Sequence, residues 1–520
     1  MVRVDDGTPA YRATLARHFG HLPRDRKQHE IVLEVDDASW AWLQQHGYTP
    51  RFDAVLSALF RSELAKTIPG FACYNTVEET DAFIDAQVAA YPTLASSIDI
   101  GDSWEKLTPG GLAGYDLRLL KITNAAVVED KPKMFLMSGL HAREYTPVQL
   151  NLKFAEWLLA NHGVDAEATW LVDHNEFHVL LQANPDGRKI AESGASQRKN
   201  RHPYAACSGT GIGVDLNRNF PFYWNLVPGG SSGAACDETY RGPSASSEPE
   251  TTAVDLYVTS LFADTRSGNE NSLTDAAAET THGEFFDMHS SGGLVLYPWG
   301  VTASASGNDA SFKAIARRLA WFNGYSPEAA AELYPTDGAS DDNAYGKLGV
   351  PAFTFELGTT FFQSCSTFTN TILPNNLAAM RYAARVLHRP YQLPSGPDSY
   401  APAAVPNSVT AGQTITLTAT ANDSRFQNSN GSEVAQNISA AIVTLDRLPW
   451  DPLAVALPMD ASDGAFDEAL ETLQAPIATL ALSAGRHIAF VQAIDASGAS
   501  GAPAAVFFDV LPDLFNDSFE

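Results

Sequence analysis

Short apolar runs alternate with helix-like segments between Gly70 and about Pro390, and this alternation is typical of an α/β domain. Strands are predicted at residues 134–137, 177–181, 294–297 and 352–355. A helix is predicted to start at Thr146-Pro147, to place apolar side chains on one face over 148–159 and to end at Gly163. Binding sites in open α/β sheets lie at the carboxyl ends of strands, so the polar residues that follow these runs are the candidate functional residues.

The regions on either side of this domain have different patterns. Residues 391–406 are rich in Pro, Ser and Ala and predict a linker. Residues 407–512 alternate with a period of two at 414–418 and 488–494, which predicts an all-β sandwich, and 513–520 predict a tail. Residues 1–68 predict a small unit with a strand at 30–35, a helix around 40–43 and a second helix at 55–64. This unit could be a pro-segment or an elaboration of the domain at 69–390.

Length and charge limit the possible classes of protein. A chain of 520 residues is too long for one core and predicts two or three domains. Lys plus Arg number 34 and Asp plus Glu number 61, which gives a net charge of −27. This charge argues against nucleic acid or an anionic membrane as a partner. It favours a positively charged substrate, or it only keeps the protein soluble.

The cysteines and the apolar runs bear on the compartment. No apolar run approaches the roughly 20 residues of a membrane span, and the first 30 residues lack the apolar core of a signal peptide. Four cysteines allow three pairings, or they are free thiols. Cys207 and Cys236 lie in Gly- and Ser-rich loops around residues 213–220, where a disulfide would fix a loop with little core of its own. If they are bridged, the protein is secreted or periplasmic, with its signal removed or upstream of Met1.

The segment His141-Ala142-Arg143-Glu144 follows the predicted strand at 134–137 and sets an imidazole and a carboxylate three residues apart. Zn²⁺ takes both kinds of ligand, and a catalytic zinc site uses three protein ligands. His289, which follows the run at 284–288, is the best candidate for the third ligand. The spacing of His141 and Glu144 alone is weak evidence for a zinc site, so the assignment depends on the remaining motifs.

Seven motifs occur in an order that resembles the zinc metallocarboxypeptidases of the pancreatic carboxypeptidase A/B type, over about residues 70–390. The resemblance implies a mixed central sheet flanked by helices, one zinc ion in the catalytic domain and hydrolysis at the C-termini of peptides or proteins. The motifs are His141-Ala142-Arg143-Glu144, Asn184-Pro185-Asp186-Gly187, Arg198-Lys199-Asn200-Arg201, the run 213–220, Glu238-Thr239-Tyr240, His289-Ser290 and Phe353-Thr354-Phe355-Glu356-Leu357.

The resemblance implies a catalytic role for each of five residues. His141, Glu144 and His289 would hold zinc, which activates water and polarises the scissile carbonyl. Glu356 matches the general base, which takes the proton of water and returns it to the leaving amine. Arg198 matches the cation that stabilises the developing oxyanion.

Substrate binding is implied for a second set of residues. Asn217 and Arg218 match the clamp for the substrate's terminal carboxylate, and Tyr334 matches the tyrosine that covers the bound C-terminal residue. Arg143 resembles an outer binding arginine. Asp341 falls at the floor of the side-chain pocket, where an aspartate resembles the B-type enzymes that remove Lys or Arg. Alternatively, the Asp341 side chain turns outward into solvent.

Three positions depart from the pancreatic pattern, namely Ser291, Asn343 and Gly358, so the pocket wall could differ. Three competing functions also stay open. The enzyme could have A-like or broad specificity, or it could be an amidase of the same fold that acts on cell-wall peptides. It could also be a binding protein whose β-sandwich, with an unknown partner, is the working part; that alternative predicts a missing zinc ligand or base.

Overall fold

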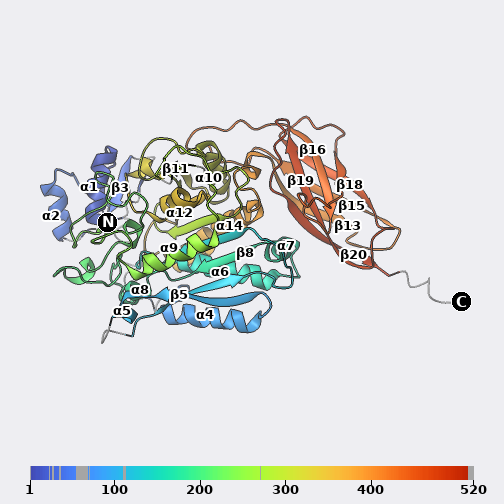
Figure 1. Cartoon of the computed structure of the whole chain (residues 1–520). Helices are drawn as coiled ribbons and strands as arrows, with labels where there is room; N and C mark the ends of the chain where they lie inside the picture. Colours follow the sequence, from blue (N-terminus) through green and yellow to red (C-terminus); the bar gives the residue numbers. More distant parts are fainter. Residues whose placement is uncertain are drawn as a thin grey trace.

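The computed structural model describes most of the 520 residues and contains three structural units (Figure 1). The predicted helix at 55–64 and the predicted tail at 513–520 lie outside the described residues. The described residues are 2–20, 22, 24–25, 29–33, 35, 37–53, 68, 71–108, 113–266, 268–269 and 271–512.

The central unit contains an eight-stranded sheet in the order β11-β10-β12-β9-β7-β8-β6-β5. β12, β9, β7 and β8 run parallel to one another, whereas β10, β6 and β5 each run antiparallel to a neighbour, so the sheet is mixed as expected. The strands are β5 (Ala95–Asp102), β6 (Asp116–Ile122), β7 (Lys133–Ser138), β8 (Glu176–Leu180), β9 (Glu284–His289), β10 (Leu294–Tyr297), β11 (Ser326–Ala329) and β12 (Ala352–Glu356).

Helices flank this sheet, and α14 packs against both α6 and α10 (Figure 1). The predicted helix after the His-Ala-Arg-Glu segment is α6, which begins at Tyr145 rather than Thr146, because Glu144 occupies the N-cap position. The helices are α4 (Val77–Ala90), α5 (Trp104–Leu107), α6 (Tyr145–Asn161), α7 (Ala166–His174), α8 (Pro185–Ala191), α9 (Pro249–Leu261), α10 (Asp309–Asn323), α11 (Ala330–Leu333), α12 (Ser340–Leu348), α13 (Cys365–Thr367) and α14 (Leu373–Val386).

The N-terminal unit is a four-stranded antiparallel sheet, in the order β2-β3-β1-β4, with two helices. Its apolar core is continuous with the central unit, because Leu15 and Ile31 cluster with Leu296 and Tyr334. The N-terminal unit therefore packs over the strand β10 and the segment that carries Tyr334. Its elements are β1 (Val2–Asp5), α1 (Pro9–Phe19), β2 (Arg24–Asp25), β3 (Glu30–Leu33), α2 (Asp37–Gln45) and β4 (Arg51–Phe52).

The C-terminal unit is all-β, as predicted, and its strands follow one continuous order, β13-β15-β18-β17-β16-β19-β20-β14. β17 pairs with both β16 and β18, and the two halves that it joins share one apolar core, which includes Leu417, Leu473, Val443 and Val491. The strands are β13 (Asp398–Val405), β14 (Ser408–Thr410), β15 (Thr414–Asn422), β16 (Ile438–Leu445), β17 (Leu457–Ala461), β18 (Leu470–Ala478), β19 (Gly485–Asp495) and β20 (Ala504–Leu511).

Part of the predicted linker at 391–406 is wrong, because residues 398–405 form the edge strand β13, paired with β15. The one proline inside this strand fits it: Pro402 lies where the register shifts between Tyr400 and Ala403, so its missing N–H breaks no regular ladder. A buried ion pair joins this strand to the central unit. Arg385 of α14 donates to Asp398 over 2.8 Å.

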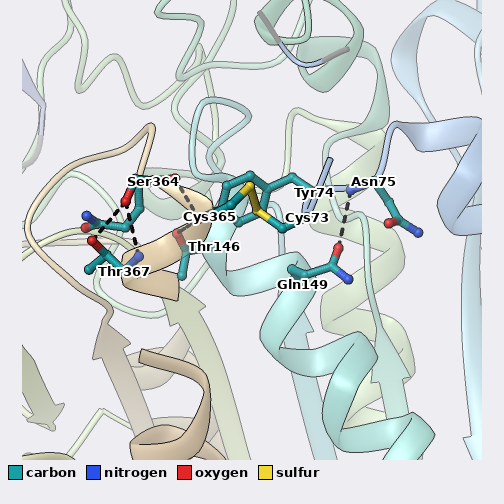
Figure 2. Close-up of a disulfide and its surroundings, with 9 residues drawn as sticks. Cys73, Tyr74, Asn75, Thr146, Gln149, Ser364, Cys365 and Thr367 are labelled. Carbon is teal, nitrogen blue, oxygen red and sulfur yellow. Dashed lines mark hydrogen bonds between the residues drawn. A yellow bond between two sulfur atoms is a disulfide. The ribbon is translucent and has the colours of Figure 1, made fainter. Parts of the chain in front are cut away.

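All four cysteines form disulfides, so the alternative of four free thiols is wrong. The predicted pair Cys207–Cys236 is confirmed, and Cys73–Cys365 links the segment before α4 to α13 (Figure 2). Beside the second bridge, the Tyr74 hydroxyl donates to the carbonyl of Gln363 over 2.8 Å. Among the described residues, no helix combines the length and apolarity needed to cross a membrane.

Candidate active site

Three neighbouring strands bring the candidate catalytic residues to one edge of the central sheet. β7, β9 and β12 are parallel and adjacent, so their carboxyl ends meet. His141 lies three residues beyond β7, while His289 and Glu356 end β9 and β12 and are direct partners in the register. The sheet topology therefore gathers residues that are far apart in the sequence.

His141, Glu144 and His289 form a buried group whose ligand atoms lie within 4.8 Å of one another. His141 Nδ1 is 2.9 Å from Glu144 Oε1, and His289 Nδ1 is 3.0 Å from Glu144 Oε2. Burial opposes ionisation of Glu144, but the two imidazoles outweigh it and hold the pKa of this carboxyl well below its ordinary value. Two imidazole nitrogens and one carboxylate are the donor set of a catalytic zinc site, so the group fits the metal.

The second nitrogen of each imidazole also faces a buried carboxylate. His141 Nε2 is 3.0 Å from Asp215 Oδ1, and His289 Nε2 is 2.9 Å from Asp287 Oδ2. Neither aspartate is among the site residues predicted from the sequence. A signal was available for Asp287, because it precedes His289 by two residues on a strand, which places both side chains on the same face of the sheet.

Arg198 is buried beside this group and is tied to it through Asp215. Its Nη2 and Nε donate to Asp215 Oδ2 over 2.9 and 3.2 Å, and its Nη1 is 3.2 Å from His141 Nδ1. Burial opposes the charge on Arg198, but Asp215 outweighs it and raises the pKa of the guanidinium. The site therefore holds a fixed cation next to the metal group.

A cavity of about 40 Å³ opens next to these residues. Glu356 lies on its wall, and burial raises the pKa of this carboxyl well above its ordinary value. The cavity is far smaller than the roughly 300 Å³ of a small ligand pocket. Its lining brings together seven of the ten predicted site residues, namely His141, Arg198, Asn217, Arg218, Tyr334, Asp341 and Glu356.

The residues predicted to bind the substrate carboxylate are held by the backbone around them. The Asn217 side-chain oxygen accepts from the Ser340 N–H over 2.8 Å. Arg218 donates from Nε to the carbonyl of Gly230 over 3.1 Å, and its guanidinium lies 6.0 Å from the ring centre of Tyr334. The 3₁₀ turn Leu216–Arg218 sets the positions of both clamp residues.

Asp341 lines the same cavity and is only 3% exposed, so its side chain does not turn outward into solvent. Its Oδ2 accepts from the Thr354 hydroxyl over 3.1 Å, and its Oδ1 accepts from the Asp342 N–H over 2.8 Å. Burial raises the pKa of Asp341. Of the three departures from the pancreatic pattern, Ser291, Asn343 and Gly358, none lines the cavity among the described residues.

Arg143 lies outside the cavity lining and contacts the N-terminal unit. Its Nη2 donates to the carbonyl of Phe19 over 3.2 Å, and its Nη1 donates to Glu238 over 3.1 Å. Gly20, at the C-cap of α1 with φ of 78°, comes so close that an added Cβ would lie 2.9 Å from Arg198 Cδ. A larger residue there would clash with the site.

Comparison with known proteins agrees with this geometry. A model of the zinc carboxypeptidase family matches residues 80–379. Human carboxypeptidase B is 31% identical over 317 residues, covering 59% of this chain and 68% of the relative. Rat carboxypeptidase A1 is 27% identical over 327 residues, covering 61% of this chain and 70% of the relative.

Two solved structures share the fold. Thrombin-activatable fibrinolysis inhibitor aligns over 74% of this chain and 98% of its own, with 21% identity and a TM-score of 0.58. Carboxypeptidase A from Helicoverpa armigera aligns over 74% of this chain and 97% of its own, with 20% identity and a TM-score of 0.59. Together with the family match and the buried His-Glu-His group, these findings identify the chain as a metallopeptidase of the zinc carboxypeptidase family.

Proposed function

We propose that the protein removes C-terminal Lys or Arg residues from peptides and proteins. The observation that carries this proposal is the buried carboxylate of Asp341 in the same cavity as Arg218 and Glu356. A substrate that offers both a terminal carboxylate and a cationic side chain has a partner for each charge there. The alternative of an inert binding protein predicted a missing zinc ligand or base. The chain has the three proposed zinc ligands and the proposed base, Glu356.

Glu356 is proposed to act as the general base and acid. It takes the proton of the attacking water and delivers it to the leaving amine as the C–N bond of the peptide breaks. Zinc, when it is bound by His141, Glu144 and His289, supplies Lewis-acid activation of water and of the scissile carbonyl. Arg198 faces the oxyanion that develops at that carbonyl and stabilises it electrostatically.

Recognition is proposed to depend on two charge pairs. Arg218 and Asn217 bind the terminal carboxylate of the substrate, and Tyr334 covers the bound residue. Asp341 pairs with the cationic side chain. Burial raises the pKa of Asp341 and so disfavours its ionised form. A guanidinium or ammonium group of the substrate beside it would favour the ionised form again. An apolar side chain would leave that carboxylate without a counter-charge, which disfavours A-like specificity.

The residues proposed to bind the α-carboxylate of the substrate also argue against the amidase alternative. An amidase that acts on internal or N-acyl groups has no use for a guanidinium aimed at a free α-carboxylate. Arg218 is 3% exposed and lines the cavity, and burying a cation is costly unless a ligand or a partner uses its charge. This favours the carboxypeptidase reaction.

The N-terminal unit is proposed to be a pro-segment that inhibits the enzyme until it is cleaved. Two observations support this role. It engages Arg143 through the carbonyl of Phe19, and it packs on Tyr334. The remaining cavity of about 40 Å³ is too small for a lysine or arginine residue.

Secretion is proposed from the disulfides. Two disulfides in one chain are typical of an oxidising compartment, and proteins of the cytosol seldom keep them. The acidic net charge of −27 fits a cationic substrate in that setting.

A direct test uses the chain after cleavage at a protease site engineered within residues 54–67. Hippuryl-Arg and hippuryl-Phe are compared, with and without 1,10-phenanthroline. The proposal predicts faster turnover of hippuryl-Arg and loss of turnover with the chelator. Faster turnover of hippuryl-Phe would remove the Lys/Arg preference, and a chelator-insensitive protein would remove the zinc mechanism.

A further inference from the structure

Both imidazoles of the metal group direct Nδ1 toward Glu144 and Nε2 toward another buried carboxylate. When Nδ1 of a histidine binds a metal, Nε2 keeps its hydrogen and needs an acceptor. For His141 the acceptor is Asp215, which is shared with Arg198. For His289, the side chains of Asp287 and Asn217 are both close enough to Nε2 to be the acceptor.

The orientation of the Asn217 amide excludes Asn217 as the acceptor for His289 Nε2–H. Its Oδ1 accepts from the Ser340 N–H over 2.8 Å, which fixes the amide nitrogen on the side that faces His289 Nε2, 3.3 Å away. An amide nitrogen donates and does not accept, so it is no partner for an N–H group. Asp287 Oδ2, at 2.9 Å, is the acceptor that remains.

Asp287 is itself held in place. The Ser340 hydroxyl donates to the same Oδ2 over 2.5 Å, and Asp287 is fully buried on β9, two residues before His289. Among the described residues, no lysine or arginine forms an ion pair with Asp287, whereas Arg198 offsets the charge of Asp215. Within the described part of the chain, the Asp287 carboxylate therefore faces His289 without a lysine or arginine beside it.

We infer that Asp287 is a positioning residue for the metal centre, an inference that rests on the proposed zinc ligands. Asp287 fixes His289 in the tautomer with hydrogen on Nε2 and aims Nδ1 at the metal. Its charge also makes the imidazole a stronger ligand. Ser340 links this support to the pocket, because its neighbour Asp341 lines the cavity and its backbone holds Asn217.

The test measures the zinc dissociation constant of the full chain by competition with a chelator. Asp287→Ala is expected to weaken zinc binding by about 10- to 100-fold, and Asp287→Asn by less, because the amide oxygen can still accept. Ser340→Ala keeps the carboxylate and is expected to have a smaller effect than Asp287→Ala. The Ser340→Ala variant therefore provides a second test of the inference if Asp287→Ala does not fold.

Glu284→Gln is the matched control. Glu284 is also buried on β9, at the opposite end of the strand from His289, and burial raises its pKa well above the ordinary value, so a neutral side chain resembles its native state. The zinc affinity of the Glu284→Gln variant should equal that of the wild type. The visible spectrum of the Co²⁺-substituted protein should change in Asp287→Ala and stay unchanged in Glu284→Gln. For the zinc-saturated, cleaved Asp287→Ala enzyme, KM should stay near the wild-type value while kcat falls, whereas both should stay unchanged in Glu284→Gln.

Three negative outcomes are possible, and the third has a different meaning from the first two. If the wild type binds zinc and Asp287→Ala binds it within about threefold as tightly, Asp287 is not a positioning residue. Equal loss of zinc affinity in Asn217→Ala and Asp287→Ala would also overturn the inference. If the wild type binds no zinc at His141, Glu144 and His289, the proposed function fails first.

Discussion

Two buried carboxylates at the end of the central sheet each lie between basic side chains. Glu144 lies between two imidazoles, and Asp215 lies between His141 and Arg198. Such pairs are costly to break, because each partner would be left as an unpaired buried charge. Glu356 differs, since burial raises its pKa and its proposed role depends on proton transfer rather than on metal binding.

Glu356→Gln separates these roles. The amide has nearly the same shape but cannot take a proton, so kcat of the cleaved enzyme should fall by about 10²- to 10⁴-fold. Zinc content should stay at that of the wild type, because Glu356 is not among the three residues of the metal group. Metal analysis and turnover of hippuryl-Arg check this together. A variant that kept wild-type kcat would exclude Glu356 as the base.

At the scale of elements, the loop closed by Cys207–Cys236 carries both residues of the proposed carboxylate clamp. The segment 207–236 contains little regular structure apart from two 3₁₀ turns. The bridge therefore limits the freedom of a loop that must hold Asn217 and Arg218 in place.

Replacing both cysteines by serine should lower the free energy of unfolding by about 3–4 kcal/mol, as expected for a bridge that closes a loop of this length. KM for hippuryl-Arg should rise more than kcat falls, because the clamp binds the substrate and does not take part in proton transfer. Chemical denaturation and steady-state kinetics of the cleaved enzyme measure the two effects. An unchanged KM would mean that the clamp is positioned without the bridge.

A second prediction at this scale concerns α9, whose first turn carries the buried Glu250. Burial raises the pKa of Glu250 to about 8, from 4.5. The folded state therefore keeps this proton up to about pH 8, whereas the unfolded chain releases it near pH 4.5. The stability contributed by Glu250 is fully present below about pH 4.5 and is lost as the pH rises to about 8.

Glu250→Gln stays neutral, so it should flatten the fall in stability over that range. Its Tm should exceed that of the wild type by several degrees at pH 8 and approach it near pH 4.5. Asp460→Asn, at an exposed position of β17, is the control and should follow the wild-type curve. Parallel Tm curves for Glu250→Gln and the wild type would contradict the assignment.

At the scale of the whole molecule, the N-terminal unit and the catalytic site form one packed structure. The carbonyl of Phe19 accepts from Arg143 and Gly20 lies next to Arg198, so the unit is proposed to close the site from outside. Cleavage within residues 54–67 should therefore raise activity on hippuryl-Arg at least tenfold, because it releases the contacts over Tyr334. Equal activity before and after cleavage would show that residues 1–68 do not inhibit.

The sequence predicted the inner strands β7, β8, β10 and β12 of the central sheet, because strands buried on both faces are continuous apolar runs. The half-exposed edge strand β5, with the sequence ASSIDIGD, lacks such a run and was not predicted. The predicted zinc ligands lie together as expected. Asp287 was missed because the run at 284–288 was used only to place His289.

Contacts between distant segments could not be predicted. The carbonyl of Phe19 accepts from Arg143, a pairing that depends on how the N-terminal and central units pack together. The edge strand β13 was assigned to the linker because the segment 391–406 is rich in Pro, Ser and Ala, although pairing with β15 tolerates Pro402 at a bulge.

The most direct test of the proposed reaction is the profile of amino acids that the cleaved enzyme releases from a mixed pool of peptides. The wild type should release C-terminal Lys and Arg first and should release almost nothing in 1,10-phenanthroline. Asp341→Ser should lose that preference while keeping its zinc. Release of apolar residues ahead of Lys and Arg by the wild type, or the same profile in Asp341→Ser, would contradict the account.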